Sequence, residues 1–151
     1  MKKKPFAPEA KQLSFLFAKQ LQTIYRANDF PEIIIPMPLH PLKMLLRGFN
    51  QSLLVAQFLS AKLAYTEVKN NICIRKHFAQ AQRLGSRIQR LKILPTTFVV
   101  YNQSEIQGKT LALVDDVVTT GSTASAATAS LLNAGAKPVD LWCIAKTSWQ
   151  N

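Results

Sequence analysis

Two adjacent acids, Asp115 and Asp116, directly follow an apolar run that starts at Leu111. A short unbroken apolar run is typical of a strand that is buried on both faces of a parallel sheet. The acids are therefore expected at the carboxyl end of a buried strand. Two carboxylates placed side by side can accept hydrogen bonds from the vicinal hydroxyl groups of a ribose.

A short turn rich in hydroxyl groups follows the acids, and its residues are Thr119, Thr120, Gly121, Ser122 and Thr123. The glycine can turn the backbone where other residues cannot. A helix is predicted over residues 124–134, and the positive end of its dipole faces the turn. These features together predict a sugar-phosphate site at the helix N-terminus. An ordinary capped strand-to-helix turn would explain the hydroxyls, but it would not explain two consecutive acids.

A proline-rich loop is predicted after a second buried strand at residues 32–35. Three prolines within residues 36–41 should prevent a helix or a central strand there and stiffen the segment. This loop contains Met37, Pro38 and Leu39, and it falls at the carboxyl end of its strand, where open α/β sheets bind ligands. Arg47 adds positive charge shortly afterwards. The alternative for Arg47 is a solvated surface position.

Strand and helix patterns alternate along the rest of the chain. Helices are predicted over residues 8–27 and 51–63, and strands over residues 71–74, 97–101 and 139–145. This alternation predicts an α/β fold with a mostly parallel twisted sheet flanked by helices. We expect residues 1–30 to form a helical covering segment and residues 31–151 to form the ligand-binding domain.

The composition limits the class of protein. The 151 residues suffice for one compact domain, and a hydrophobic share of 48% suits a globular fold. The net charge of +11 favours phosphate-rich partners, although a solubilising surface would also explain it. Cys73 and Cys143 are expected to be buried free thiols, because they lack the spacing of a zinc site. We see no signal peptide or membrane-spanning run, so a cytoplasmic protein without membrane insertion is expected.

A basic segment extends from residue 77 to residue 92. Arg83, Arg87 and Arg90 are spaced so that a helix would align them on one face. Three roles stay open for this face: a solvated helix surface, closure over a bound pyrophosphate, and contact with a nucleic-acid backbone.

Residues 111–123 resemble the phosphoribosyl diphosphate (PRPP) binding motif of type I phosphoribosyltransferases. That motif consists of hydrophobic residues, two acids, two more hydrophobic residues and a loop similar to Thr-Thr-Gly-x-Thr. Each of these positions is filled in this sequence. The resemblance combines specific residue types with the expected order of strand, loop and helix.

Two further motifs resemble the ComF family of phosphoribosyltransferase-like proteins, which are associated with natural competence, the uptake of DNA by bacteria. They are Pro-x-Pro-Leu-His at residues 36–40 and Arg-Gly-Phe-Asn-Gln at residues 47–51. Other positions that fit the family in order and spacing are Arg75, Gln82, Arg87, Arg90 and Phe98. Members usually carry an N-terminal four-cysteine zinc module, which this sequence lacks, so a truncated or divergent member is expected.

The resemblance implies a role for each candidate residue. It places Asp115 and Asp116 on the ribose hydroxyls and residues 119–123 on the 5′-phosphate. Met37, Pro38 and Leu39 would contact pyrophosphate together with Arg47. Asp115, Asp116 and Arg47 would form the catalytic set. Magnesium would be held largely by PRPP itself, without a metal site built from protein ligands.

The resemblance also implies two alternative functions. One is a competence-associated protein that binds PRPP or a related ribose phosphate with magnesium and takes part in transformation and DNA uptake. Its partners would include single-stranded DNA or a DNA-uptake or helicase protein. The other is an active phosphoribosyltransferase of nucleotide salvage, which transfers ribose 5-phosphate to an unidentified base.

Overall fold

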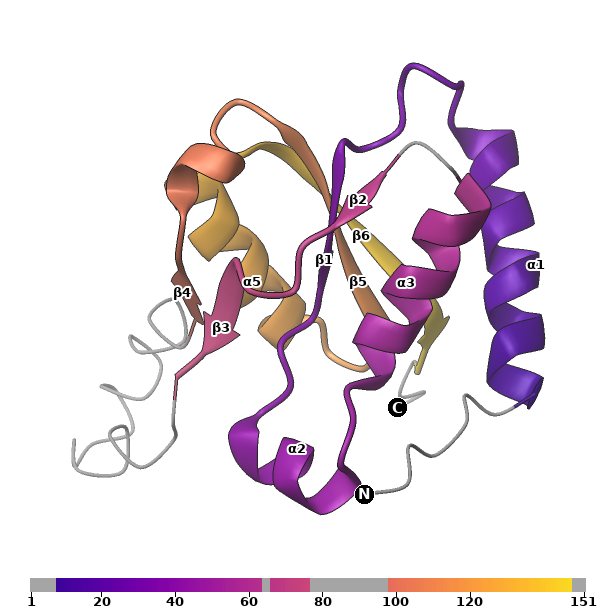
Figure 1. Ribbon diagram of the computed structural model, residues 1–151, viewed down its shortest axis with the longest axis horizontal. Helices are drawn as coiled ribbons and strands as arrows, with labels where there is room; N and C mark the ends of the chain where they lie inside the picture. Colours follow the sequence, from indigo (N-terminus) through magenta and orange to yellow (C-terminus); the bar gives the residue numbers. More distant parts are fainter. Residues whose placement is uncertain (1–7, 64–65, 77–97, 148–151) are drawn as a thin grey trace.

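The central sheet has four parallel strands in the order β2-β1-β5-β6 (Figure 1). The computed structural model describes residues 8–63, 66–76 and 98–147. The strands are β1 (Ile33–Pro36), β2 (Glu67–Val68), β5 (Thr110–Val118) and β6 (Lys137–Lys146). A separate antiparallel pair is formed by β3 (Cys73–Arg75) and β4 (Phe98–Val100). The predicted α/β fold with a mostly parallel sheet is confirmed.

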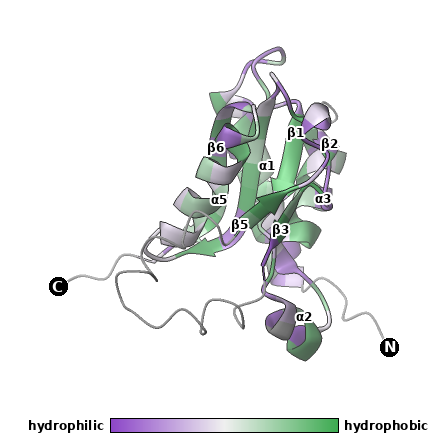
Figure 2. Ribbon diagram, turned by 90° about the vertical axis from the view of Figure 1, so that its left-hand side faces the viewer, coloured by the Kyte–Doolittle hydropathy of each residue, from purple (hydrophilic) through white to green (hydrophobic). Residues whose placement is uncertain are grey.

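Helices cover both faces of this sheet (Figure 1). On one face lie α1 (Pro8–Ile24) and α3 (Gln51–Leu63), and on the other lies α5 (Ser122–Asn133) with the β3–β4 pair. Ile33 and Ile35 pack toward α5, whereas Ile34 packs toward α3. Strand β1 is therefore buried on both faces, and Figure 2 shows that the strand is strongly apolar.

The prolines do not act as expected. Pro36 is the last residue of the interior strand β1, and Pro41 is the first residue of α2 (Pro41–Arg47). The expectation that this segment contains neither a helix nor part of a central strand is therefore wrong. Ile34 accepts a hydrogen bond from Lys69 on the β2 side, so Pro36 faces the same side, beyond the end of β2, where no N–H is needed. Pro41 occupies a first helical position, where proline costs no hydrogen bond.

Strand β5 is longer than its apolar run. The acids lie inside it rather than at its end, and Asp115 pairs in register with Cys143 of β6. The strand continues to Val118 before the hydroxyl turn begins. The short elements β2 and α2 were not predicted, because two to seven residues give too little periodicity.

The N-terminal helix buries one narrow face, which mixes small and large side chains. Ser14, Ala18 and Leu21 are buried, and the last two share a core with α3, β1 and β5. Leu16 and Ile24 are 56% and 63% exposed, so these two large apolar side chains lie outside the core. The division of the chain at residues 30 and 31 remains a prediction.

The two cysteines differ in their surroundings. Both are free thiols, as expected. Cys73 is buried, and burial raises the pKa of its thiol to about 12. Cys143 is only partly buried, so the expectation of a fully buried thiol is wrong there. Within the described ranges no helix is long and apolar enough to cross a membrane.

Candidate functional site

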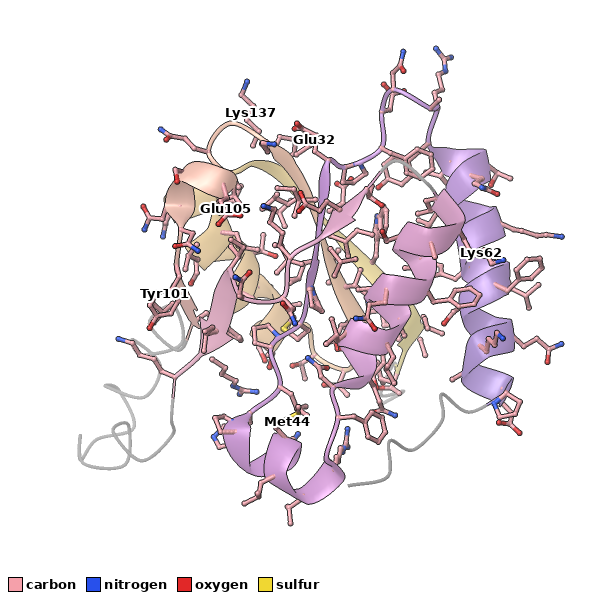
Figure 3. The ribbon with its side chains drawn as sticks, viewed as in Figure 1. Glu32, Met44, Lys62, Tyr101, Glu105 and Lys137 are labelled. Atoms are coloured by element: carbon pink, nitrogen blue, oxygen red, sulfur yellow. The ribbon has the colours of Figure 1, made fainter. Side chains whose placement is uncertain are left out.

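A pocket of about 510 Å³ lies at the carboxyl ends of β1 and β5. Figure 3 shows which end of the sheet this is. Met44 of α2 lies at the opposite end of the molecule from Glu32 and Lys137, which mark the amino ends of β1 and β6. All but one of the predicted site residues line this pocket, and the exception is Ser122. The predicted residues that line the pocket are Met37, Pro38, Leu39, Arg47, Asp115, Asp116, Thr119, Thr120, Gly121 and Thr123.

The acidic pair lines the pocket and is partly buried. Asp115 Oδ1 accepts hydrogen bonds from Ser52 Oγ at 3.1 Å and from the backbone N–H of Asp116 at 3.0 Å. Burial and, to a smaller extent, the neighbouring Asp116 raise the pKa of Asp115 to about 6, against the opposing effect of the hydrogen bond from Ser52. At neutral pH the Asp115 carboxylate is therefore mostly ionised and can accept hydrogen bonds from a ligand.

The hydroxyl turn leads directly into α5. Gly121 is the residue before the helix, and its φ of 77° lies in the left-handed region that glycine tolerates. The hydroxyl oxygens of Thr120 and Ser122 lie 3.0 Å apart. The N–H of Ser122 donates to Thr120 Oγ1 at 3.4 Å. The next two residues of the helix, Thr123 and Ala124, line the pocket, and because the first N–H groups of a helix have no partner within the helix, theirs are the ones that suit an anion.

The loop after β1 is held by an amide that sequence reasoning missed. Asn50 Nδ2 donates to the carbonyl oxygen of Met37 at 3.0 Å, and Asn50 Oδ1 accepts from the N–H of Ser52 at 3.0 Å. The Met37 N–H also donates to the carbonyl oxygen of Val114 at 2.7 Å. Asn50 thus joins the loop to the start of α3, and Ser52 joins α3 to Asp115. An asparagine directly before a predicted helix was the available signal.

Three basic side chains line the pocket. Arg47 is exposed at the end of α2, and its Nη1 donates to Gln51 Oε1 at 2.9 Å. Lys43 of α2 and Arg75 of β3 also line the pocket, and neither was singled out for a site role from the sequence. Arg47 is both exposed and part of the pocket lining, so the alternative of a solvated surface position stays open.

The residues present suit a ligand-borne metal better than a protein-built metal site. In the described part of the chain, no group of three or more His, Cys, Asp or Glu side chains could hold a metal ion. Two carboxylates alone leave most positions around Mg²⁺ for phosphate oxygens and water. The segment with Arg83, Arg87 and Arg90 lies outside the described residues.

Known proteins with similar sequences share much of this chain. Competence protein F from Haemophilus influenzae is 32% identical over 116 residues, which cover 77% of this chain and 51% of that protein. DNA utilization protein YhgH from Escherichia coli O157:H7 is 37% identical over 119 residues, which cover 79% of this chain and 51% of that protein. The chain thus spans about half the length of these relatives. The resemblance to the ComF family is confirmed.

Solved structures support the fold. A purine phosphoribosyltransferase from Pyrococcus horikoshii has a TM-score of 0.57 at 19% identity, covering 93% of this chain and 74% of that one. The glutamine PRPP amidotransferase of B. subtilis has a TM-score of 0.61 at 15% identity, covering 89% of this chain and 26% of that one. The family model for the phosphoribosyl transferase domain matches residues 50–148. The chain therefore belongs to the phosphoribosyl transferase domain family.

Proposed function

We propose that this chain binds PRPP or a related ribose phosphate in the pocket at the carboxyl ends of β1 and β5. The observation that carries the proposal is that three features line one cavity. They are an acidic pair, a hydroxyl turn at a helix N-terminus, and a basic wall formed by Lys43, Arg47 and Arg75. Each of these suits a different part of the ligand. The acids suit the ribose hydroxyls, the turn suits the 5′-phosphate, and the basic wall suits pyrophosphate.

The site residues divide the work accordingly. Asp115 and Asp116 accept hydrogen bonds from the two ribose hydroxyls when they are ionised. Residues 119–123 hold the 5′-phosphate through N–H and hydroxyl groups. Ser122 does not line the cavity with the others, so its part is its contact with the Thr120 hydroxyl. The loop of residues 37–39 and Arg47 receive the diphosphate. Magnesium bound to PRPP would neutralise part of the diphosphate charge, with Asp115 and Asp116 as the nearby carboxylates.

We further propose that the chain takes part in natural competence or DNA utilization. The names of its relatives support this role, and the net charge of +11 suits a partner such as single-stranded DNA. In this role the ribose-phosphate pocket acts as a binding or regulatory site. A deletion strain tests the proposal, because transformation frequency should fall. Unchanged transformation together with no binding of single-stranded DNA at low salt would exclude it.

The second candidate is an active phosphoribosyltransferase, and the basic wall of the pocket favours it. In this reaction a nitrogen atom of the acceptor forms a bond to C1′ of the ribose. The bond from C1′ to the diphosphate oxygen breaks, and the diphosphate leaves with the electron pair. Lys43 and Arg47 stand in the wall that would stabilise the departing negative charge. Labelled PRPP should then release pyrophosphate with one of a panel of bases, and no release with any base would count against this candidate.

Calorimetric titration tests the binding proposal directly. PRPP and ribose 5-phosphate are titrated into the protein with and without magnesium. The Asp116→Asn variant should bind both ribose ligands at least about tenfold more weakly, because it loses a charged acceptor. Asp29→Asn is the matched control, since Asp29 is an exposed acid outside the pocket. Wild-type protein that binds neither ligand would refute the proposal.

A further inference from the structure

We propose that two copies of this chain associate through the outer edge of β6 and the neighbouring side of α1. Strand β6 is the last in the order of the central sheet, and among the described residues no strand pairs with its outer edge. Such an edge presents a row of backbone N–H and C=O groups that can bind a further strand. Antiparallel pairing of two β6 strands would continue one sheet through both copies about a twofold axis. Neither β6 nor α1 contributes a residue to the pocket lining, so this surface is separate from the candidate site.

Most of β6 lacks the features that prevent pairing at an edge. Proline and lysine are typical of protected edges, and here they occupy the first two positions of the strand, Lys137 and Pro138. The N–H of Thr147 donates to Val118 of β5. Because backbone groups alternate along a strand, those of residues 140, 142, 144 and 146 then point away from β5. Residues 140–146 thus offer an edge that contains no proline and no glycine.

Charge complementarity selects one register for this pairing. Asp140 and Lys146 are the charged residues of the strand beyond Pro138, and they lie on the same face of β6 because they are six residues apart. When Asp140 of each copy faces Lys146 of the other copy, two opposite-charge pairs form beside about eight backbone hydrogen bonds. Asp140 Oδ2 accepts from the Tyr25 hydroxyl, and its other oxygen is then the acceptor for lysine. The surface is therefore complementary to itself, which makes a second copy its occupant.

The same register matches apolar residues with one another. Trp142 of each copy lies opposite Ile144 of the other, and Leu141 lies opposite Ala145. Leu141 and Ala145 are exposed in the single chain, so pairing would remove apolar surface from water. Cys143 falls on the twofold axis, opposite its own counterpart.

The side of α1 that lies next to this edge is apolar and uncharged. Helix α3 packs on β1 and β5, whereas α1 packs beside α3 and on β6, so the side of α1 remote from α3 lies at the outer edge of β6. Phe15 marks the α3 side, because the ammonium group of Lys62 lies 5.8 Å from its ring centre. Leu13, Leu16 and Ile24 recur at helical spacing away from Phe15, and each is more than half exposed. A twofold axis at β6 would bring the two copies of this stripe face to face.

Sedimentation velocity over a wide range of protein concentration tests the association. The salt concentration is chosen to screen the net charge of +11. The wild-type mass should rise toward twice that of the chain. Lys146→Glu should raise the dimer Kd by about tenfold, because two opposite-charge pairs become two like-charge pairs. Lys137→Glu is the matched control, since Lys137 is on the same strand but outside the paired segment.

A second pair of variants tests the α1 stripe. Leu16→Lys places a charge in the stripe, so it should also raise the dimer Kd by about tenfold or more. Leu45→Lys is its control, because Leu45 is an exposed leucine of α2, outside the proposed surface. PRPP binding is measured in parallel, and Leu16→Lys and Lys146→Glu should leave its affinity unchanged.

Cysteine crosslinking tests the register. The two Cys143 residues would form a pair without backbone hydrogen bonds, whose Cα atoms are about 4.5 Å apart, and this distance permits a disulfide. Copper phenanthroline in air should oxidise the two thiols to one disulfide between the copies. Cys143→Ser should abolish this product, because Cys73 is buried. Ala145→Cys combined with Cys143→Ser should not restore it, since the new thiols would lie out of register.

Each of three outcomes would overturn the inference. The first is wild-type protein that stays monomeric over the whole range of concentration. The second is a dimer that Lys146→Glu and Leu16→Lys leave intact, because the copies would then meet at another face. The third is a dimer that Cys143 does not crosslink, because the strands would then pair in another register or not at all. Circular dichroism spectra identify a variant that fails to fold, and if Leu16→Lys does so, Lys146→Glu and the crosslink decide.

Discussion

Asn50 should affect both the stability of the fold and the affinity of the pocket. Its side chain donates to the carbonyl of Met37 at 3.0 Å and accepts from the N–H of Ser52 at 3.0 Å. Asn50→Ala removes both hydrogen bonds. The first holds the loop that lines the pocket, and the second caps the N-terminus of α3.

The expected loss follows from these two contacts. Removing an N-terminal cap costs about 1 kcal/mol. The net contribution of a further hydrogen bond is also about 1 kcal/mol, which gives a total of about 2 kcal/mol. For a chain of this size, each kcal/mol lowers Tm by about 2–4 °C, so Asn50→Ala should lower Tm by about 4–8 °C. Pyrophosphate binding should weaken as well, because the loop of residues 37–39 loses its anchor.

Asn50→Ser separates the two effects. Serine can cap the helix, but its side chain is too short to reach the Met37 carbonyl. The fall in Tm of this variant should be about half that of Asn50→Ala. Its loss of affinity for pyrophosphate should equal that of Asn50→Ala. Thermal unfolding followed by circular dichroism measures the first quantity, and calorimetry measures the second. Wild-type Tm in Asn50→Ala, or wild-type affinity in both variants, would refute this account of Asn50.

Three more substitutions have definite expected outcomes. The folded-state pKa of Asp115 is raised from 3.8 to about 6, so its ionisation destabilises the fold as pH rises through that window. In urea unfolding, Asp115→Asn should therefore be more stable than wild type at pH 7 and as stable as wild type below about pH 4. The variant should also bind ribose 5-phosphate more weakly. Gly121→Ala should cost about 1 kcal/mol from the left-handed φ of 77° alone, because among the described residues no atom beyond the two chain neighbours lies within 4 Å of an added Cβ. Calorimetry should also show weaker ribose 5-phosphate binding. Tyr25→Phe loses the bonds to Asp140 (2.7 Å) and from Trp142 (3.1 Å), so thermal unfolding should show about 1–2 kcal/mol less stability with unchanged ligand affinity.

Most of the candidate site residues that the sequence predicted lie in one contiguous stretch. Asp115, Asp116 and the hydroxyl turn fall within nine residues, and their order matches the order of strand, turn and helix. Local patterning therefore suffices for them. The predicted helix over residues 51–63 agrees with α3 in both bounds, because a glycine-containing turn precedes its apolar residues.

The missed parts depend on tertiary structure. Ser52 and Asp115 are 63 residues apart, and only the packing of α3 against β5 brings them together. Arg75 reaches the pocket through the β3–β4 pair, which a single sequence does not reveal. Which face of α1 is buried depends on its packing against α3, which leaves Ala18 buried and Leu16 exposed.

The hydrogen bonds of Tyr25 have a practical consequence for anyone who prepares shorter versions of this chain. Tyr25 lies just beyond α1, yet its hydroxyl group is bonded to two side chains of the edge strand β6. A fragment that starts at residue 31 would lose this hydroxyl and would uncover the Trp142 ring, which is now 3% exposed. Such a fragment is expected to expose apolar surface and to precipitate, even though every residue of the candidate pocket lies downstream of the cut.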